Sequence, residues 1–138
     1  MLVDGRGIPL SLSVSGANTN DGTLLEPTLK ARVTLPARGT VTCMHLCADM
    51  AYGGRPQLEI IYAYGYLPHV HPWKKGPRAS RPPHHKRGRR WVVERTHSWL
   101  NRFRKILVRF EKTLAAHEGL LELACALIVF RQVITIYG

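Results

Sequence analysis

The chain has 138 residues, a formal net charge of +11 and a hydrophobic fraction of 45%. This length suits a single domain with a modest core, and the apolar fraction excludes a wholly disordered chain. Most of the 20 basic residues lie between Lys74 and Lys112, where the acids are Glu94 and Glu111. Such a basic block is expected to bind phosphate, so nucleic acid is the predicted partner. A ribosomal-type RNA binder and a solvated basic tail are the alternatives.

Targeting signals are not predicted at either end of the chain. Met1 is followed by Leu-Val-Asp-Gly rather than by a basic and then apolar run, so we expect no signal peptide. The longest apolar stretch, residues 120–136, is interrupted by Glu122 and Arg131, so we expect no membrane span. Three cysteines without an export signal predict reduced thiols in a cytosol.

The first part of the chain alternates short strand and helix patterns. Apolar alternation predicts strands, glycine pairs predict turns, and one stretch has a short amphipathic period. We expect strands at residues 1–4, 9–15, 40–48 and 65–70, a turn at 5–7, a polar loop at 16–22, helical turns at 23–30, a turn at 52–54 and a helix at 55–62.

The second and third parts are a linker and a pair of helices. Residues 71–88 are rich in Pro, Lys, Arg and His and are predicted to be a basic linker. Residues 89–110 have the period of one amphipathic helix, and residues 113–136 are predicted to form a packing helix with a broad apolar face. That face is expected to contain Leu114, Leu120, Leu121, Ala124, Leu127, Ile128 and Val133.

The helix predicted at residues 89–110 has two distinct sides. At about 100° per residue, one apolar stripe forms on one side. The stripe contains Val92, Trp99, Phe103, Ile106 and Phe110. Glu94 points away from it and shares its side with Arg90, Ser98, Asn101 and Lys105. An acid held among cations over a surface suits a metal ion beside a polyanion, and it equally suits an ordinary solvated acid.

Asp49 is the second acid of interest, because it closes a strand pattern just before a glycine turn. Carboxylates at strand ends can bind ligands or metals, although many merely cap the next turn. With Glu94, Asp49 could help to hold two divalent ions for phosphoryl transfer. Cys43, His45 and Cys47 alternate along one strand; zinc is conceivable there, but packing is the simpler interpretation because no fourth ligand is indicated.

Three blocks resemble bacterial insertion-sequence transposases of the DDE type, in the insertion-sequence-five group. They are residues 4–10 (DGRGIPL) with 16–21 (GANTND), residues 46–53 (LCADMAYG), and residues 90–104 (RWVVERTHSWLNRFR) with 109–112 (RFEK). The resemblance spans nearly the whole chain and is weakest over residues 60–88.

The resemblance implies an α/β, ribonuclease-H-like fold followed by C-terminal helices, over residues 1–138 as a single partial domain. It implies Mg²⁺- or Mn²⁺-dependent cleavage and strand transfer at transposon DNA ends. Asp49 and Glu94 would be the second and third metal-binding acids. The basic residues expected at the DNA are Arg90, Arg95, Arg102, Arg104 and Lys105. In related transposases a lysine often stands seven residues after the glutamate, where this chain has Asn101.

The first catalytic aspartate of this family lies on a strand upstream of the Asp4 segment, and the sequence contains no counterpart. Asp4 belongs to the following strand, and Asp21 is interpreted as a loop acid that shapes the site. The mixed sheet would therefore lack its first, central strand. We expect a DNA-binding fragment that is inactive alone, whose partner is the upstream half of a split transposase. A non-catalytic nucleic-acid-binding protein and a decayed gene product are the alternatives.

Overall fold

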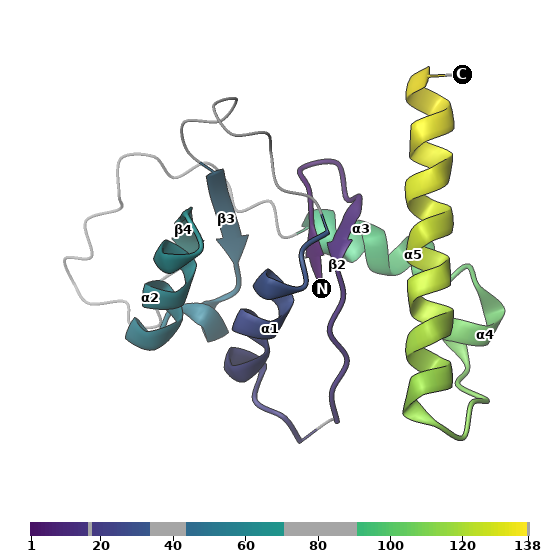
Figure 1. The fold of residues 1–138 in the computed structure, drawn as a ribbon, viewed down its shortest axis with the longest axis horizontal. Coiled ribbons are helices and arrows are strands. Elements are labelled where there is room, and N and C mark those ends of the chain that lie inside the picture. The colour runs from purple at the N-terminus through teal and green to yellow at the C-terminus, as the bar shows by residue number, and fades with distance from the viewer. Residues whose placement is uncertain (17, 34–43, 71–90, 138) are drawn as a thin grey trace. The chain divides into compact units, whose positions relative to one another are not determined.

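The computed structural model describes residues 1–16, 18–33, 44–70 and 91–137 (Figure 1). The chain divides into two compact units. Unit 1 is Met1–Val14 with Trp91–Gly138, and unit 2 is Ser15–Arg90. The predicted linker at residues 71–88 and the start of the predicted strand at residues 40–43 lie outside the described residues.

Unit 1 begins with the predicted strand–turn–strand segment. Strands β1 (Leu2–Val3) and β2 (Pro9–Ser11) pair antiparallel, so β2 is shorter than predicted. The Asp4 carboxylate organises the turn, because its Oδ1 accepts hydrogen bonds from the backbone N–H groups of Arg6 and Ile8, both at 2.8 Å. Gly7 has a φ of 88°, which explains glycine at the end of the turn. The predicted turn at residues 5–7 is thus confirmed.

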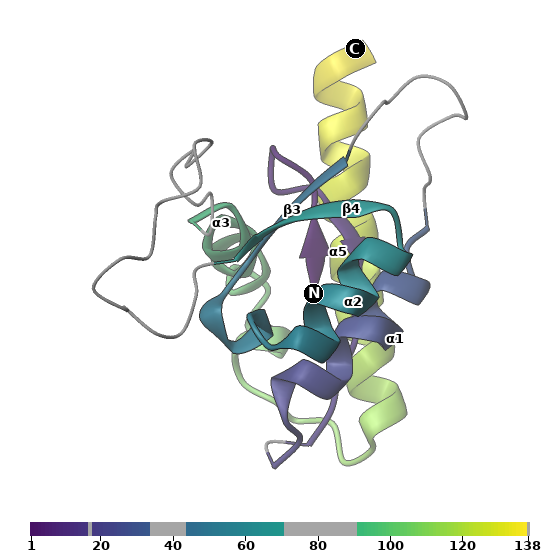
Figure 2. The same ribbon diagram turned by 90° about the vertical axis from the view of Figure 1, so that its left-hand side faces the viewer.

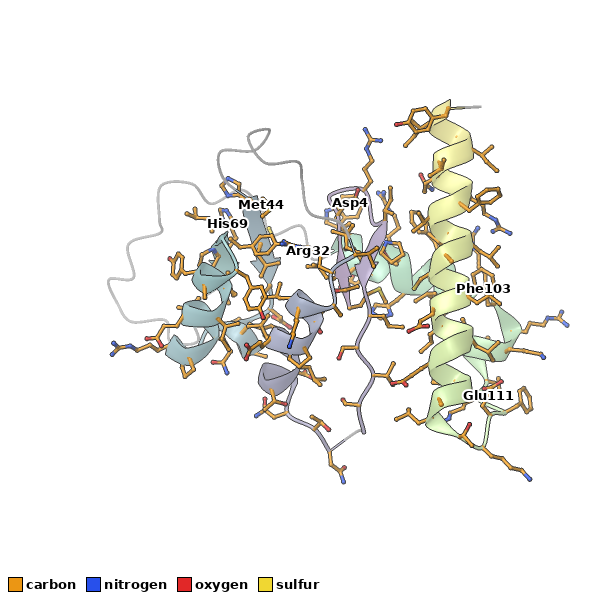
Figure 3. The ribbon with its side chains drawn as sticks, in the orientation of Figure 1. Asp4, Arg32, Met44, His69, Phe103 and Glu111 are labelled. Carbon is orange, nitrogen blue, oxygen red and sulfur yellow. The ribbon has the colours of Figure 1, made fainter. Side chains whose placement is uncertain are left out.

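The single helix predicted at residues 89–110 was wrong. The structure has α3 (Trp91–Leu100), a turn, and the short α4 (Arg104–Leu107). Phe103 adopts an extended conformation, and its N–H donates to the Leu100 carbonyl in a tighter i→i−3 bond. The break lets Phe103 and Ile106 pack on the cluster formed by Leu100, Ala124 and Ile128; Phe103 lies beside α5 in Figure 3. Phe110, which was assigned to the apolar stripe, is 74% exposed.

The second predicted helix is confirmed as α5 (Leu114–Tyr137), the long helix that ends the chain in Figure 1. Its predicted burial was largely wrong, because only Ala124 and Ile128 are buried among the described residues of this helix. Leu114, Leu127 and Val133 belong to the predicted packing face but are exposed. Unit 1 therefore covers one narrow stripe of α5 and leaves the rest of its apolar surface open.

Helix α5 is long and apolar enough to cross a membrane, with a mean hydropathy of 1.9 in its most apolar window. Of the residues in that window, 11% are buried. Glu122 and Arg131 therefore do not exclude a span on composition alone, and the expectation of no membrane span stays a prediction. The core helix of a soluble protein can meet the same criterion. We therefore do not assign α5 to a membrane.

Unit 2 contains the predicted strand, helix and strand, and the structure shows that the two strands pair in parallel. Strand β3 (Met44–Ala48) is followed by the 3₁₀ turn η2 (Met50–Tyr52), helix α2 (Arg55–Ala63) and strand β4 (Tyr66–Val70). The two strands pair in parallel from Met44↔Tyr66 to Ala48↔Val70, and Figure 2 shows them running together. The α2 helix begins with Pro56 in its first turn, where a missing N–H costs no hydrogen bond.

The core of unit 2 forms where its helices meet these strands. The 3₁₀ turn η1 (Asp21–Leu24) leads into α1 (Leu25–Lys30), which confirms the predicted helical turns. The buried apolar residues of the unit are Leu25, Leu29, Leu46, Ile61 and Tyr66. Arg32 holds the end of α1 to β4, since its guanidinium donates to the Tyr66 hydroxyl and lies 5.1 Å from the centre of the Tyr66 ring.

The described strands form two separate two-stranded sheets, one antiparallel (β1–β2) and one parallel (β3–β4). The mixed α/β class predicted from the sequence is therefore confirmed.

Candidate functional site

Asp49 lies in unit 2, directly after β3, and its side chain is exposed. Its Oδ1 accepts a hydrogen bond from the Met50 N–H at 2.7 Å, and the carboxylate thereby caps η2. The capping role considered from the sequence is thus present. Capping fixes the carboxylate at the C-terminal end of a strand in a β–α–β segment, where ligands bind in open α/β sheets.

Asp21 and Asp49 act on the same tyrosine. Burial raises the pKa of the Tyr52 hydroxyl, and the charges of Asp21 and then Asp49 raise it further. The charges of the two acids therefore act on one group within unit 2, and the site-shaping role of Asp21 stays a prediction. The sequence assigned Tyr52 only to a turn, because nothing in the local pattern shows that both carboxylates act on its hydroxyl.

The loop that carries Asp21 is fixed close to α2. Asn20 Oδ1 accepts from the Gly22 N–H at 2.8 Å and caps η1. Gly22 is buried, and a Cβ there would lie 2.9 Å from Gln57 Nε2. The Gln57 side chain on α2 therefore lies against the backbone of the Asp21 loop at Gly22.

Glu94 lies in unit 1 on the exposed side of α3, while Val92, Thr96 and Leu100 are buried. The predicted orientation of Glu94, away from the apolar stripe, is confirmed. The glutamate is near the N-terminal end of the helix, where the helix dipole favours a negative charge.

The α3 helix is held to the β1–β2 turn by a buried polar contact. Thr96 is fully buried, and its hydroxyl donates to the Gly7 carbonyl at 2.6 Å. A Cβ added to Gly7 would lie 3.2 Å from Thr96 Oγ1 and 3.4 Å from the Val92 carbonyl oxygen. Arg95 adds a second tie by donating to the Arg6 carbonyl at 3.3 Å. The helix that presents Glu94 is thus anchored to a turn far away in sequence, a contact that periodicity alone did not reveal.

Asp4 has a structural role in the same turn. Its Oδ1 already accepts two backbone N–H groups, as described above. This arrangement agrees with the sequence interpretation that Asp4 does not replace a missing catalytic acid. In Figure 3 it lies at the turn of the β1–β2 hairpin.

The basic residues predicted at DNA are exposed where the structure describes them. Arg102 lies in the turn after α3, and Arg104 and Lys105 lie on α4. Arg95 is exposed too, with its guanidinium carbon 4.4 Å from the centre of the Trp91 ring. Arg90 lies outside the described residues. Asn101, at the position where related proteins often have lysine, is exposed at the end of α3.

The carboxylates of Asp49 and Glu94 are hard oxygen donors of the kind that Mg²⁺ and Mn²⁺ prefer. Asp49 belongs to unit 2 and Glu94 belongs to unit 1. Among the described residues, no group of three or more His, Cys, Asp or Glu side chains is arranged to hold a metal ion. The donor chemistry therefore fits these ions, whereas the described set is smaller than a two-metal site requires.

Comparison with known proteins supplies the context for these residues. Residues 1–129 match the sequence family described as "Transposase DDE domain". The chain is 34% identical over 136 residues to a Burkholderia cepacia protein named "Putative transposase for insertion sequence element IS402". The match covers 93% of this chain and 60% of that relative. No solved structure matches.

Proposed function

Because the chain belongs to the transposase DDE domain family, we propose that it supplies part of the catalytic domain of an insertion-sequence transposase. Its role would be to bind transposon ends and to contribute Asp49 and Glu94 to the cleavage and transfer of DNA strands. One observation carries this proposal. Glu94 is presented on the exposed face of α3, and that helix is anchored to the β1–β2 turn by the buried Thr96.

Divalent metal ions are the proposed cofactor. Mg²⁺ or Mn²⁺ would activate the attacking oxygen and stabilise the leaving oxygen during phosphoryl transfer. Asp49 and Glu94 would hold these ions through their carboxylates. The Asp49 side chain is kept at the end of β3 by its bond to the Met50 N–H, so the chain positions this ligand through its own backbone.

The proposed fold is ribonuclease-H-like with its first strand missing. The antiparallel β1–β2 hairpin and the parallel β3–β4 pair are both elements that a mixed sheet requires. A further strand in such a sheet would satisfy the backbone groups of an edge strand. That strand would carry the first catalytic aspartate, and the upstream half of a split transposase would provide it.

The chain alone would then bind DNA without cutting it. Two carboxylates hold divalent metal more weakly than three, and the two-metal geometry is incomplete. Contact with DNA phosphates would come from Arg90, Arg95, Arg102, Arg104 and Lys105. We place this activity in the bacterial cytoplasm, on the nucleoid.

Fluorescence anisotropy with labelled duplex DNA tests the proposal. Arg102→Glu with Arg104→Glu should weaken binding and flatten its salt dependence by roughly 0.9 units of log–log slope per lost phosphate contact. The matched control is Arg55→Glu, an exposed arginine on α2, which should leave binding nearly unchanged. Equal losses in the control would contradict the assignment of this surface.

The same assay separates the proposal from a non-catalytic nucleic-acid binder. In a transposase fragment, Mg²⁺ should strengthen DNA binding, and Asp49→Asn or Glu94→Gln should reduce that metal effect while binding in EDTA is unchanged. If neither substitution alters the response to Mg²⁺, the non-catalytic alternative is favoured.

A further inference from the structure

The exposed face of the β3–β4 pair contains two histidines that are far apart in sequence. In the parallel register, His45 pairs with Leu67 and Cys47 pairs with His69. Alternate residues of a strand share a face, so these four side chains lie on the same side of the sheet. His45, Cys47 and Leu67 are exposed, whereas Leu46, on the other face, is buried. Figure 3 labels His69, on β4.

The two imidazole rings are in direct contact. His45 Nδ1 and His69 Nε2 are 2.6 Å apart, and the ring centres are 4.9 Å apart with an interplanar angle of 31°. A nitrogen pair at this distance requires one ring to donate and the other to accept. At least one ring is therefore neutral, with a lone pair directed at its neighbour, which is the state in which imidazole binds metals.

We propose that His45 and His69 form a binding site for a borderline divalent cation, with Zn²⁺ as the reference ion. Two ring nitrogens at about 2.0–2.1 Å from a tetrahedral ion lie about 3.3 Å apart, so the pair must open by roughly 0.7 Å. Rotation of the exposed His45 side chain supplies that movement without a change in the strands. The ion takes the place of the proton between the two rings, and that proton moves, through solvent, to the outer nitrogen of its own ring, so that both rings bind as neutral imidazoles.

The ligand set distinguishes this site from the proposed catalytic one. Imidazole nitrogen suits Zn²⁺, Ni²⁺ and Cu²⁺, whereas Mg²⁺ and Mn²⁺ prefer carboxylate oxygen. The described residues provide no third ligand in place, so water completes the coordination. Cys47 is exposed and pairs with His69 across the two strands. It is therefore the candidate for a third protein ligand. Cys43, the first residue of the alternating triplet, lies outside the described residues.

An ion at this position joins the two strands of the parallel pair. It would hold β4 against β3, the strand that ends at Asp49, without involving the Asp49 or Glu94 carboxylate. Zn²⁺ binding is therefore independent of the proposed DNA chemistry. A test can contradict the Zn²⁺ site without contradicting the transposase function, and the reverse also holds.

Isothermal titration of Zn²⁺ into the full chain in a reducing buffer with excess Mg²⁺ tests the site. The parent protein for this titration carries His84→Ala and His85→Ala, so that these two adjacent histidines of the basic segment cannot bind Zn²⁺. This parent should bind one Zn²⁺ per chain, and His45→Ala or His69→Ala should each weaken binding at least about tenfold. The matched control is His97→Ala, an exposed histidine on α3, which should leave the affinity unchanged.

Two results would overturn the site. One is an affinity that does not change in His45→Ala or His69→Ala. The other is a loss in Asp49→Asn as large as that in the histidine variants, which would assign Zn²⁺ to the carboxylate. His69→Gln with an unchanged circular dichroism spectrum provides a folded variant for the comparison. Weak Zn²⁺ binding in that folded variant supports the site, and retained binding contradicts it.

Discussion

Thr96 shows how one buried hydroxyl can fix the helix that presents Glu94, the proposed metal-binding acid. It is fully buried, and it bonds to the carbonyl of Gly7, a residue whose own conformation and lack of a side chain permit the approach. In this account Thr96 is a positioning residue for Glu94, because it touches neither DNA nor metal in the proposed reaction.

Replacing Thr96 with valine should destabilise the chain by about 1–3 kcal/mol, since the Gly7 carbonyl loses a buried hydrogen-bond donor while the volume is kept. Thr96→Ser keeps the hydroxyl and should retain most of the stability. Urea denaturation measures both. A valine variant as stable as the wild type would show that the hydrogen bond makes no net contribution to the free energy of unfolding.

Tyr52 reports on both acids of unit 2. Its pKa is raised first by burial and then by the charges of Asp21 and Asp49. Asp21→Asn and Asp49→Asn should each lower the pKa of Tyr52 towards the ordinary value, and burial should keep it from returning fully. NMR titration of ¹³C-labelled tyrosines, assigned with Tyr52→Phe, measures these shifts.

The sign of the linked stability effect follows from the raised pKa. The folded state holds the Tyr52 proton more tightly than the unfolded chain, so the free energy of unfolding should fall as the pH rises above about 10. Tyr52→Phe should remove this contribution. If the Tyr52 pKa is the same in both asparagine variants and the wild type, neither acid acts on the tyrosine.

Among the elements, α5 exposes an apolar stripe that unit 1 does not cover. Spacings of four and three residues alternate along it, as in the seam of a coiled coil. The stripe contains Leu123, Leu127, Phe130, Ile134 and Tyr137, all exposed. Ala124 and Ile128 form the buried stripe on another side of the same helix. An apolar surface of this kind favours association with another surface.

The purified chain should therefore associate as its concentration rises, and Leu127→Glu with Phe130→Glu should shift it towards the monomer. Thr135→Glu, at an exposed position outside the stripe, is the control and should change little. Light scattering after size exclusion measures the mass. A wild-type chain that remains monomeric at every concentration would contradict this prediction.

Elements that depend on local pattern were predictable, and those that depend on distant partners were not. Alternation and glycine turns gave the β1–β2 hairpin and the β3–α2–β4 segment. The break after Leu100 was missed because Phe103 leaves the helix to pack beside α5, which the period of residues 89–110 does not encode. The exposure of α5 was missed for the same reason, since an apolar face does not specify what covers it.

At the scale of the whole molecule, the candidate site was only partly predictable. The strand end at Asp49 and the outward direction of Glu94 followed from periodicity, and both agree with the structure. The roles of Thr96 and Tyr52 depend on contacts between distant segments and left no signal in the sequence. The pairing of Asp49 with Glu94 at one metal site stays a prediction, because the two acids belong to different units.

The most direct test of the central claim is to complete the transposase domain. Any part of the Burkholderia cepacia relative that precedes its match to this chain would be fused upstream of this chain, and nicking of supercoiled plasmid would be measured with Mg²⁺. We expect no nicking by the chain alone and clear nicking by the fusion. Asp49→Asn or Glu94→Gln should abolish it, whereas Glu118→Gln, on α5, should not. Nicking by the isolated chain that Glu94→Gln abolishes, or nicking by the fusion that neither acid affects, would contradict the account.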